Sequence, residues 1–178
     1  MIFSETEVRG AYAIAMERIE DVRGFNARMW CQREFEVHGL VTQMRQINSI
    51  FNKQRGTMRG VHYQAAPRAE AKLVRCTRGA IFAVVVDLHR DSPTHRRWAG
   101  IELTPDNYRM LYVPATCALG SQSLEDDTEI IYQVSEFYHP ESGRGVRYDD
   151  PAFGIRWPLE VTLISEKDKS WPPYSASA

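Results

Sequence analysis

The stretch AKLVRCTRGAIFAVVVDL, residues 71–88, decides the fold class. Its two apolar runs, 71–76 and 80–88, are rich in Val, Ile and Phe, the residue types that strands favour. Residues 77–79 between them have the sequence Thr-Arg-Gly, which is typical of a tight turn because glycine tolerates the backbone angles that such turns need. We therefore predict two β-strands joined by a hairpin.

Similar runs recur along the rest of the chain. Three of them, 98–103, 109–113 and 129–138, are bounded by Gly, Pro, Asp, Asn or Ser. Helical periodicity is weak and covers only short segments at 32–37 and 105–108. Many short strands with almost no helix predict an all-β protein, a jelly-roll sandwich or barrel with a few short helices.

Size and charge limit the function classes. A chain of 178 residues that is 43% hydrophobic is long enough for one core, so we predict a single domain over residues 3–172 and a tail over 173–178. The 22 Lys and Arg nearly balance the 23 Asp and Glu, and both signs are mixed along the chain. No global field favours nucleic acid or an anionic membrane, and neither is expected as a partner.

Cysteine and histidine spacing argues against disulfides and metals. The three cysteines lie far apart and form no CxxC pair, which favours a reducing compartment. The five histidines include no HxH pair, so no metal site is predicted. The N-terminus has no apolar signal region and no run is as long as a membrane span, which leads us to expect a soluble cytoplasmic protein.

The stretch MRGVHYQ, residues 58–64, holds the first candidate for chemistry. On a regular strand Gly60, His62 and Gln64 share one face, and Arg59 points to the other unless Gly60 bends the chain. Glycine permits such a bend or a close approach of the backbone to a ligand. A hydrogen-bonded core histidine is the alternative interpretation of His62.

Three further residues have ordinary structural explanations when each is taken alone. Lys72 opens a strand, where lysine is usually a solvated edge charge. Tyr132 has the setting of a half-buried strand aromatic. Asp168 lies in Ser165-Glu166-Lys167-Asp168, which has the composition of a charged surface turn.

Placed in order, stretches along almost the whole chain resemble the dTDP-4-dehydrorhamnose 3,5-epimerase family of nucleotide-sugar 4-keto epimerases. The matching stretches are 21–25, 46–49, 59–64, 72–76, 86–98, 103–107, 111–114, 132–140, 150–158 and 165–168. The resemblance implies a jelly roll of the cupin type. It also implies a homodimer that exchanges N-terminal strands and uses no metal or other cofactor.

The resemblance also implies roles for individual residues. His62 matches the general base, Asp168 the carboxylate that orients it, Lys72 the lysine beside the sugar carbonyl, and Tyr132 the proton donor on the opposite face. The residues that match contacts to the diphosphate, the nucleotide or the sugar are Arg23, Arg59, Gln46, Asn48, Gln64 and Tyr138.

These residue types suit the chemistry independently of the family. A ketone at C4 acidifies the hydrogens on C3 and C5, so inversion needs a base on one face, stabilisation of the enolate oxygen, and an acid on the other face. An unperturbed histidine titrates at about pH 6.5 and is largely neutral near pH 7. A carboxylate on its second ring nitrogen would fix the tautomer. The planar fork of arginine suits phosphate oxygens.

Two departures from the family pattern bear on which substrate is bound. Leu119 stands where relatives usually have a second histidine that lines the sugar pocket. Leucine cannot hydrogen-bond, so a polar hydroxyl facing it would be left unpaired. An unpaired hydroxyl costs about 1–3 kcal/mol when it is buried. Arg28 stands where the family commonly has an acidic residue, so its effect on the choice of nucleotide base is left open, and drift at a surface strand is the alternative.

The sequence therefore predicts an epimerase that inverts C3 and C5 of a nucleotide-linked 4-keto-6-deoxy sugar. The alternatives are inversion at C3 alone, or epimerisation of another 4-keto sugar such as a heptose. Ketoisomerisation is a third possibility. A hypothesis from a different class is a cupin that binds a nucleotide sugar without turning it over.

Overall fold

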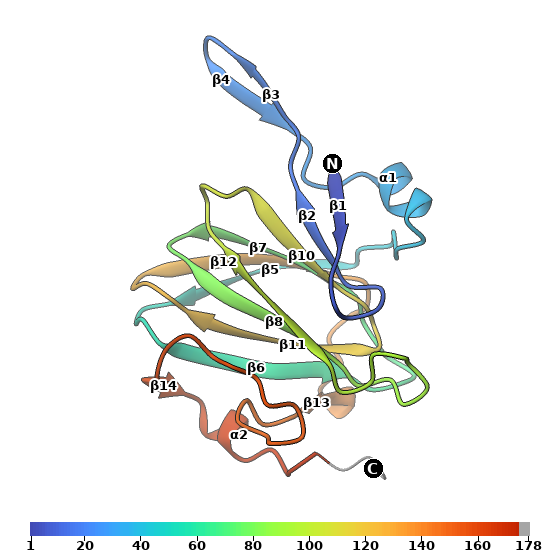
Figure 1. Cartoon of the computed structure of the whole chain (residues 1–178), viewed down its shortest axis with the longest axis vertical. Helices are drawn as coiled ribbons and strands as arrows, with labels where there is room; N and C mark the ends of the chain where they lie inside the picture. Colours follow the sequence, from blue (N-terminus) through green and yellow to red (C-terminus); the bar gives the residue numbers. More distant parts are fainter. Residues whose placement is uncertain (175–178) are drawn as a thin grey trace.

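Two β-sheets pack face to face in the computed structural model, which describes residues 1–174 (Figure 1). The first sheet has the strand order β1-β2-β10-β7-β12-β5. Its strands are β1 (Ile2–Glu5), β2 (Tyr12–Ala15), β5 (Gln46–Asn52), β7 (Lys72–Arg78), β10 (Arg109–Val113) and β12 (Thr128–Val134). All of these neighbours pair antiparallel.

The second sheet has the order β13-β6-β11-β8-β9, with β14 beside β6. Its strands are β6 (Thr57–Gln64), β8 (Ile81–Asp87), β9 (Trp98–Leu103), β11 (Cys117–Ser123), β13 (Gly143–Gly145) and β14 (Leu163–Ile164). The pairing of β14 with β6 is parallel and the others are antiparallel. The all-β class predicted from the sequence is confirmed.

Strand β8 explains why residues 80–88 are apolar without alternation. Ile81, Ala83 and Val85 belong to the core between the two sheets. Val84 and Val86 face the other way and pack with Phe153 in a second cluster. The C-terminal segment covers this outer face of the second sheet in Figure 1, so the strand is buried on both sides.

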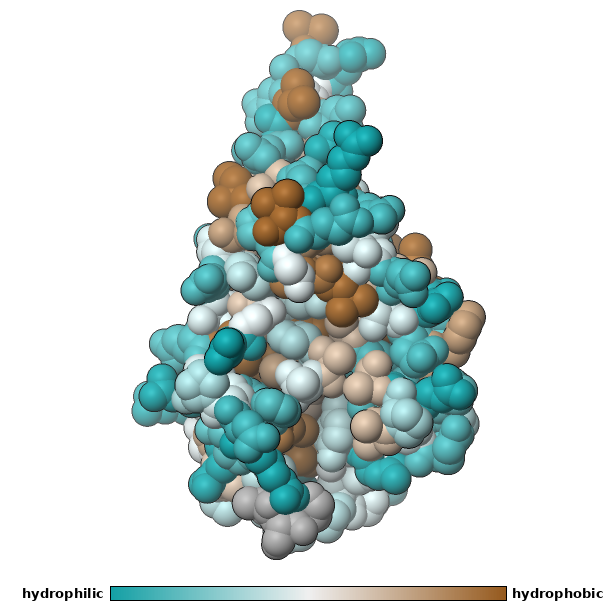
Figure 2. Space-filling view, turned by 90° about the vertical axis from the view of Figure 1, so that its right-hand side faces the viewer, coloured by the Kyte–Doolittle hydropathy of each residue, from teal (hydrophilic) through white to brown (hydrophobic). Residues whose placement is uncertain are grey.

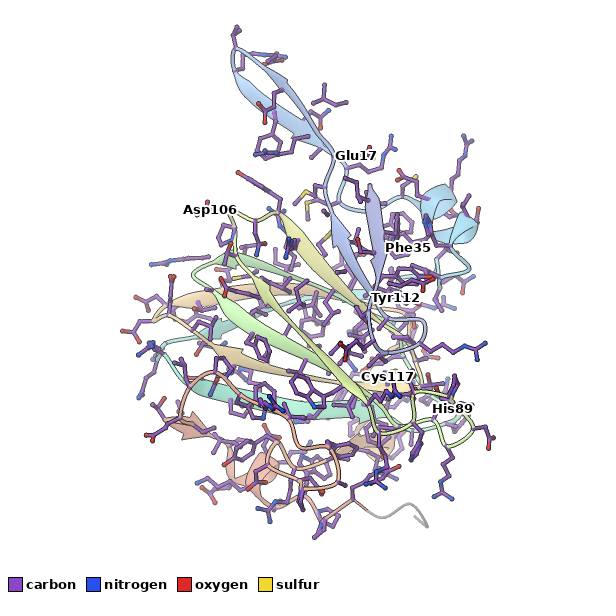
Figure 3. The ribbon with its side chains drawn as sticks, in the orientation of Figure 1. Glu17, Phe35, His89, Asp106, Tyr112 and Cys117 are labelled. Carbon is purple, nitrogen blue, oxygen red and sulfur yellow. The ribbon has the colours of Figure 1, made fainter. Side chains whose placement is uncertain are left out.

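Helix α1 (Gln32–Val37) lies against the first sheet and confirms the predicted short helix. Phe35 from this helix is fully buried and meets Tyr112 of β10 edge to face, with ring centroids 5.8 Å apart (Figure 3). This contact docks the N-terminal segment on the sandwich.

A separate hairpin of β3 (Arg18–Asp21) and β4 (Gly24–Ala27) projects from the body (Figure 1). Ile19 and Val22 are strongly exposed there, and Figure 2 shows hydrophobic side chains on the projecting end. Nothing in residues 1–174 covers them.

Two local predictions are wrong. Residues 77–79 do not form a hairpin, because β7 and β8 belong to different sheets and the turn carries the chain across the sandwich. Residues 105–108 form a turn and no helix. The Asn107 side chain accepts hydrogen bonds from the backbone N–H of Thr104 and of Arg109, which closes the turn locally.

The C-terminal segment contains a 3-10 turn, η1 (Pro140–Ser142), and helix α2 (Glu166–Lys169). Tyr174 packs on Phe153, and its backbone N–H donates to Asp150 at 2.6 Å. The rest of the predicted tail, residues 175–178, lies outside the described residues. Within residues 1–174 no helix is long and apolar enough to cross a bilayer.

Candidate active site

A cavity of about 600 Å³ opens between the two sheets. Strands β5, β7 and β12 of the first sheet line one side, and β6, β11 and β13 of the second sheet line the other, together with α2. Ten of the twelve residues predicted to serve the site line this cavity: Gln46, Asn48, Arg59, His62, Gln64, Lys72, Leu119, Tyr132, Tyr138 and Asp168.

A bulge in β6 brings Arg59 and His62 to the same side of the strand. His62 pairs with Leu119 and Arg59 pairs with Ser121, so three steps along β6 match two along β11. Gly60 between them has φ +119°, and a Cβ there would lie 2.7 Å from the Cα of Gly120. A side chain at position 60 would therefore prevent the bend that turns both residues toward the cavity.

His62 forms a hydrogen-bonded pair with Asp168. Its Nε2 donates to Asp168 Oδ1 at 2.5 Å, across 106 residues of sequence. A carboxylate only accepts, so the proton of the neutral ring lies on Nε2 and the lone pair lies on Nδ1. The imidazole is two-fifths exposed and lines the cavity, whereas Asp168 is buried.

Helix α2 fixes the carboxylate that His62 contacts. The Ser165 hydroxyl accepts from the Asp168 backbone N–H, which caps the start of the helix. The second oxygen of Asp168 accepts from the Gly60 N–H at 3.3 Å. Burial works against ionisation, but the hydrogen bonds that Asp168 accepts from His62 and from the Gly60 backbone oppose it, and the pKa of Asp168 lies below its ordinary value. Asp168 is therefore ionised at neutral pH.

Lys72, at the first position of β7, is buried beside Glu70. Its Nζ lies 2.8 Å from Glu70 Oε1, and both side chains are about nine-tenths buried. Both residues line the cavity. The arrangement keeps a cation inside the pocket wall in place of the solvated edge charge that a lysine opening a strand usually provides.

Tyr132 lies on the wall opposite to His62. It belongs to β12 of the first sheet, whereas His62 belongs to β6 of the second. Burial raises the pKa of Tyr132, the charge of Glu70 raises it further, and Arg59 opposes this shift. The phenol is therefore a proton donor throughout the neutral range.

The remaining residues of the cavity differ in how free their polar groups are. Arg59 donates from Nε to Asn52 at 2.6 Å and stays largely exposed. The Gln64 amide is buried and is occupied by protein partners, which are Arg68 O, Glu70, Phe137 O and the His139 N–H. Gln46 accepts from the Tyr138 N–H at 2.8 Å and so fixes the loop that carries this tyrosine.

Arg23 and Arg28 do not line the cavity. Arg23 lies at the turn of the projecting β3–β4 hairpin and pairs with Asp21. Arg28 follows β4 and contacts Glu34 of α1 at 2.6 Å. Within one chain, neither arginine is among the described residues that line the cavity.

Two residues of the cavity wall that were not predicted from the sequence contact the proposed catalytic side chains. Glu70 is two positions before Lys72, the spacing at which side chains of an extended segment share a face. Trp171 follows Asp168 by three positions, and its ring meets His62 edge to face with centroids 6.4 Å apart. In the described part of the chain, no three His, Cys, Asp or Glu residues come together as a metal site would require.

Comparison with known proteins defines the class. Residues 5–176 match the model of the family described as dTDP-4-dehydrorhamnose 3,5-epimerase. The dTDP-4-dehydrorhamnose 3,5-epimerase of Sinorhizobium fredii is 40% identical over 173 residues, which cover 97% of this chain and 89% of the relative. This chain is thus an isomerase of the nucleotide-sugar epimerase class.

Solved structures agree in fold. The dTDP-4-dehydrorhamnose 3,5-epimerase of Bacillus anthracis, with TDP and PPi bound, superposes with a TM-score of 0.92 at 34% identity, covering 97% of this chain and 99% of that one. A 3'-monoepimerase of Streptomyces bikiniensis in complex with dTDP-quinovose gives 0.86 at 30%, covering 94% and 85%. The chain belongs to the dTDP-4-dehydrorhamnose 3,5-epimerase family. The predicted family, enzyme class and cupin-type jelly roll are confirmed.

Proposed function

We propose that this protein epimerises a dTDP-linked 4-keto-6-deoxy sugar at C3 and C5. The observation that carries the proposal is the placement of His62 and Tyr132 on opposing sheets, with one cavity between them. Inversion of a carbon removes a proton from one face and returns one to the other. Two opposed proton-transfer groups meet that requirement.

His62 serves as the general base. With Nε2 donating to Asp168, the lone pair on Nδ1 is free to take a proton from the carbon next to the ketone. The ionised carboxylate then stabilises the imidazolium that forms. General base catalysis of this kind typically supplies about 10²–10⁴ in rate.

Lys72 and Tyr132 complete the reaction from the other sheet. The ammonium of Lys72 stabilises the negative charge that develops on the C4 oxygen when the proton leaves. Tyr132 then donates its phenolic proton to the opposite face of the enolate carbon. Solvent then takes the proton from His62 and returns one to Tyr132, and repeating the cycle at the second carbon gives the doubly inverted sugar.

The nucleotide lies along the exposed side of the cavity, where Arg59 contacts the diphosphate and Asn48 and Tyr138 contact the sugar or base. Gln46 supports Tyr138, and Gln64 supports the wall from behind.

Arg23, and Arg28 with it, act from a second copy of the chain. A homodimer in which the projecting hairpin reaches the partner's cavity explains why this hairpin exposes Ile19 and Val22. The three free cysteines suit an enzyme of the cytoplasm.

A second candidate is epimerisation at C3 alone, and one observation favours it. Leu119 lies directly across the ladder from His62 and lines the cavity. An apolar side chain beside the base disfavours a sugar hydroxyl at that point, which changes how the ring is seated. The second carbon would then be out of reach of the base.

Incubation of the protein with dTDP-4-keto-6-deoxyglucose in heavy water tests the proposal. We expect deuterium at both C3 and C5, measured by NMR and mass spectrometry. Deuterium at C3 only supports the second candidate. Tight binding of the nucleotide sugar without exchange at either carbon would contradict both and support a binding protein.

A further inference from the structure

We propose that Glu70 is the positioning residue that holds the Lys72 ammonium in place for the carbonyl oxygen of the substrate. The inference rests on the proposed function and adds a residue to it. Glu70 lies in the segment between β6 and β7, directly before the strand that carries Lys72. It lines the same cavity as His62 and Tyr132.

A series of contacts connects Lys72, through Glu70 and Gln64, to the backbone of the protein. Gln64 Nε2 shares its two hydrogens among Arg68 O, Phe137 O and one oxygen of Glu70, which is the most distant of the three at 3.3 Å. The other Glu70 oxygen lies 2.8 Å from Lys72 Nζ. Gln64 is itself held by three backbone groups, Arg68 O, Phe137 O and the His139 N–H. Glu70 therefore has little freedom to move, and a lysine paired to it keeps one position.

A purely stabilising role explains this pair poorly. Removing two charges from water costs several kcal/mol per ion, so a buried ion pair contributes little to stability compared with apolar side chains of similar size. Within residues 1–174, Glu70 is the one ion-pair partner of Lys72 Nζ. An ammonium has three N–H donors, so Lys72 can also donate to an oxygen in the cavity.

The charge of Glu70 also acts on the acid across from His62. It is one of the causes that raise the pKa of Tyr132, after burial itself. The charged groups that face this space are Arg59, His62, Glu70, Lys72, Arg144, Lys167 and Asp168. Removing the negative charge of Glu70 leaves burial to raise the pKa of Tyr132 and Arg59 to oppose it, so the phenol would lose its proton at a lower pH than in the wild type.

The test replaces Glu70 with glutamine, which keeps the size and an acceptor oxygen but removes the charge. We expect Glu70→Gln to lower kcat roughly 10–100-fold, the usual effect of a misplaced catalytic group, with KM changed less than about threefold. The alkaline limb of the pH profile should move to lower pH. Glu70→Asp should recover part of kcat, and Glu102→Gln, which removes an exposed charge on β9, should match the wild type.

Other outcomes overturn the proposal. A folded Glu70→Gln protein with wild-type kcat and an unshifted pH profile contradicts the positioning role of Glu70 but leaves the proposed function intact. A lower melting temperature with an unshifted pH profile assigns Glu70 a structural role and also contradicts it. If the wild-type protein in the same series exchanges no proton on any 4-keto sugar nucleotide, the proposed function fails first and the role of Glu70 fails with it.

Discussion

The cavity between the sheets and the projecting β3–β4 hairpin are built in opposite ways. In the cavity, the side chains assigned to the reaction are held by partners, as His62 is by the buried Asp168 and Lys72 is by Glu70. On the hairpin, Ile19 and Val22 are exposed and Arg23 pairs with the neighbouring Asp21. In the proposed mechanism, the proton-transfer groups therefore come from one chain, and the hairpin contacts a second copy.

This difference separates chemistry from binding. Groups that move protons need fixed positions, and the cavity fixes them with hydrogen bonds from several strands and α2. Groups that bind a diphosphate need charge and reach, which an exposed arginine supplies. Substitutions in the two regions should therefore affect different kinetic constants.

The largest effect is expected inside the cavity. His62→Asn removes the base but keeps a similar shape, and we expect kcat to fall about 10³-fold or more because no other histidine lines the cavity among residues 1–174. Proton exchange at C3 and C5 should fall together, measured by deuterium incorporation. Binding of dTDP, measured by calorimetry, should change less than about threefold. A variant with near-normal exchange would remove His62 from the mechanism.

A smaller effect is expected on the hairpin. Arg23→Ala should raise KM roughly tenfold with little change in kcat, because it removes one charged contact to the diphosphate. Arg33→Ala, which removes an exposed arginine from α1, is the matched control and should match the wild type.

Mixing Arg23→Ala with His62→Asn sharpens this comparison. If the hairpin serves the partner's cavity, a mixed dimer contains one site with both an intact base and an intact arginine. Activity with a low KM should then exceed the sum of the two variants. Strictly additive activity would show that Arg23 does not act across the dimer.

The smallest effect is expected at Leu119. Leu119→His adds a polar group directly across the ladder from His62 and should change the ratio of exchange at C5 to exchange at C3 by a few-fold. Leu119→Met keeps the wall apolar and should leave the ratio unchanged. An unchanged ratio in both variants would mean that this residue does not influence which carbon reacts.

Local composition predicts which residues form strands better than it predicts how those strands pair. The apolar run at 80–88 and the turn residues around it are enough to predict a strand, and β8 confirms it. The turn at 77–79 does not specify whether the next strand pairs with the last or crosses to the other sheet, and the hairpin prediction failed for that reason.

The candidate site shows the same limit. His62 and Asp168 lie 106 residues apart, so no local pattern joins them, and family resemblance alone suggested the pair. From the sequence, Arg59 could share a face with His62 only if Gly60 bent the chain. The bulge in β6 is that bend. Glu70 was missed because a Glu two positions from a Lys has the composition of a solvated strand edge. In the structure, strands that are distant in the sequence bury Glu70 instead.

Tyr132→Phe in heavy water tests the central claim most directly, because it separates removal of a proton on one sheet from its return on the other. We expect the variant still to exchange deuterium into the substrate through His62, whereas formation of the inverted product falls by about 10² or more. Wild-type product formation by Tyr132→Phe would contradict the assignment of base and acid to opposing sheets.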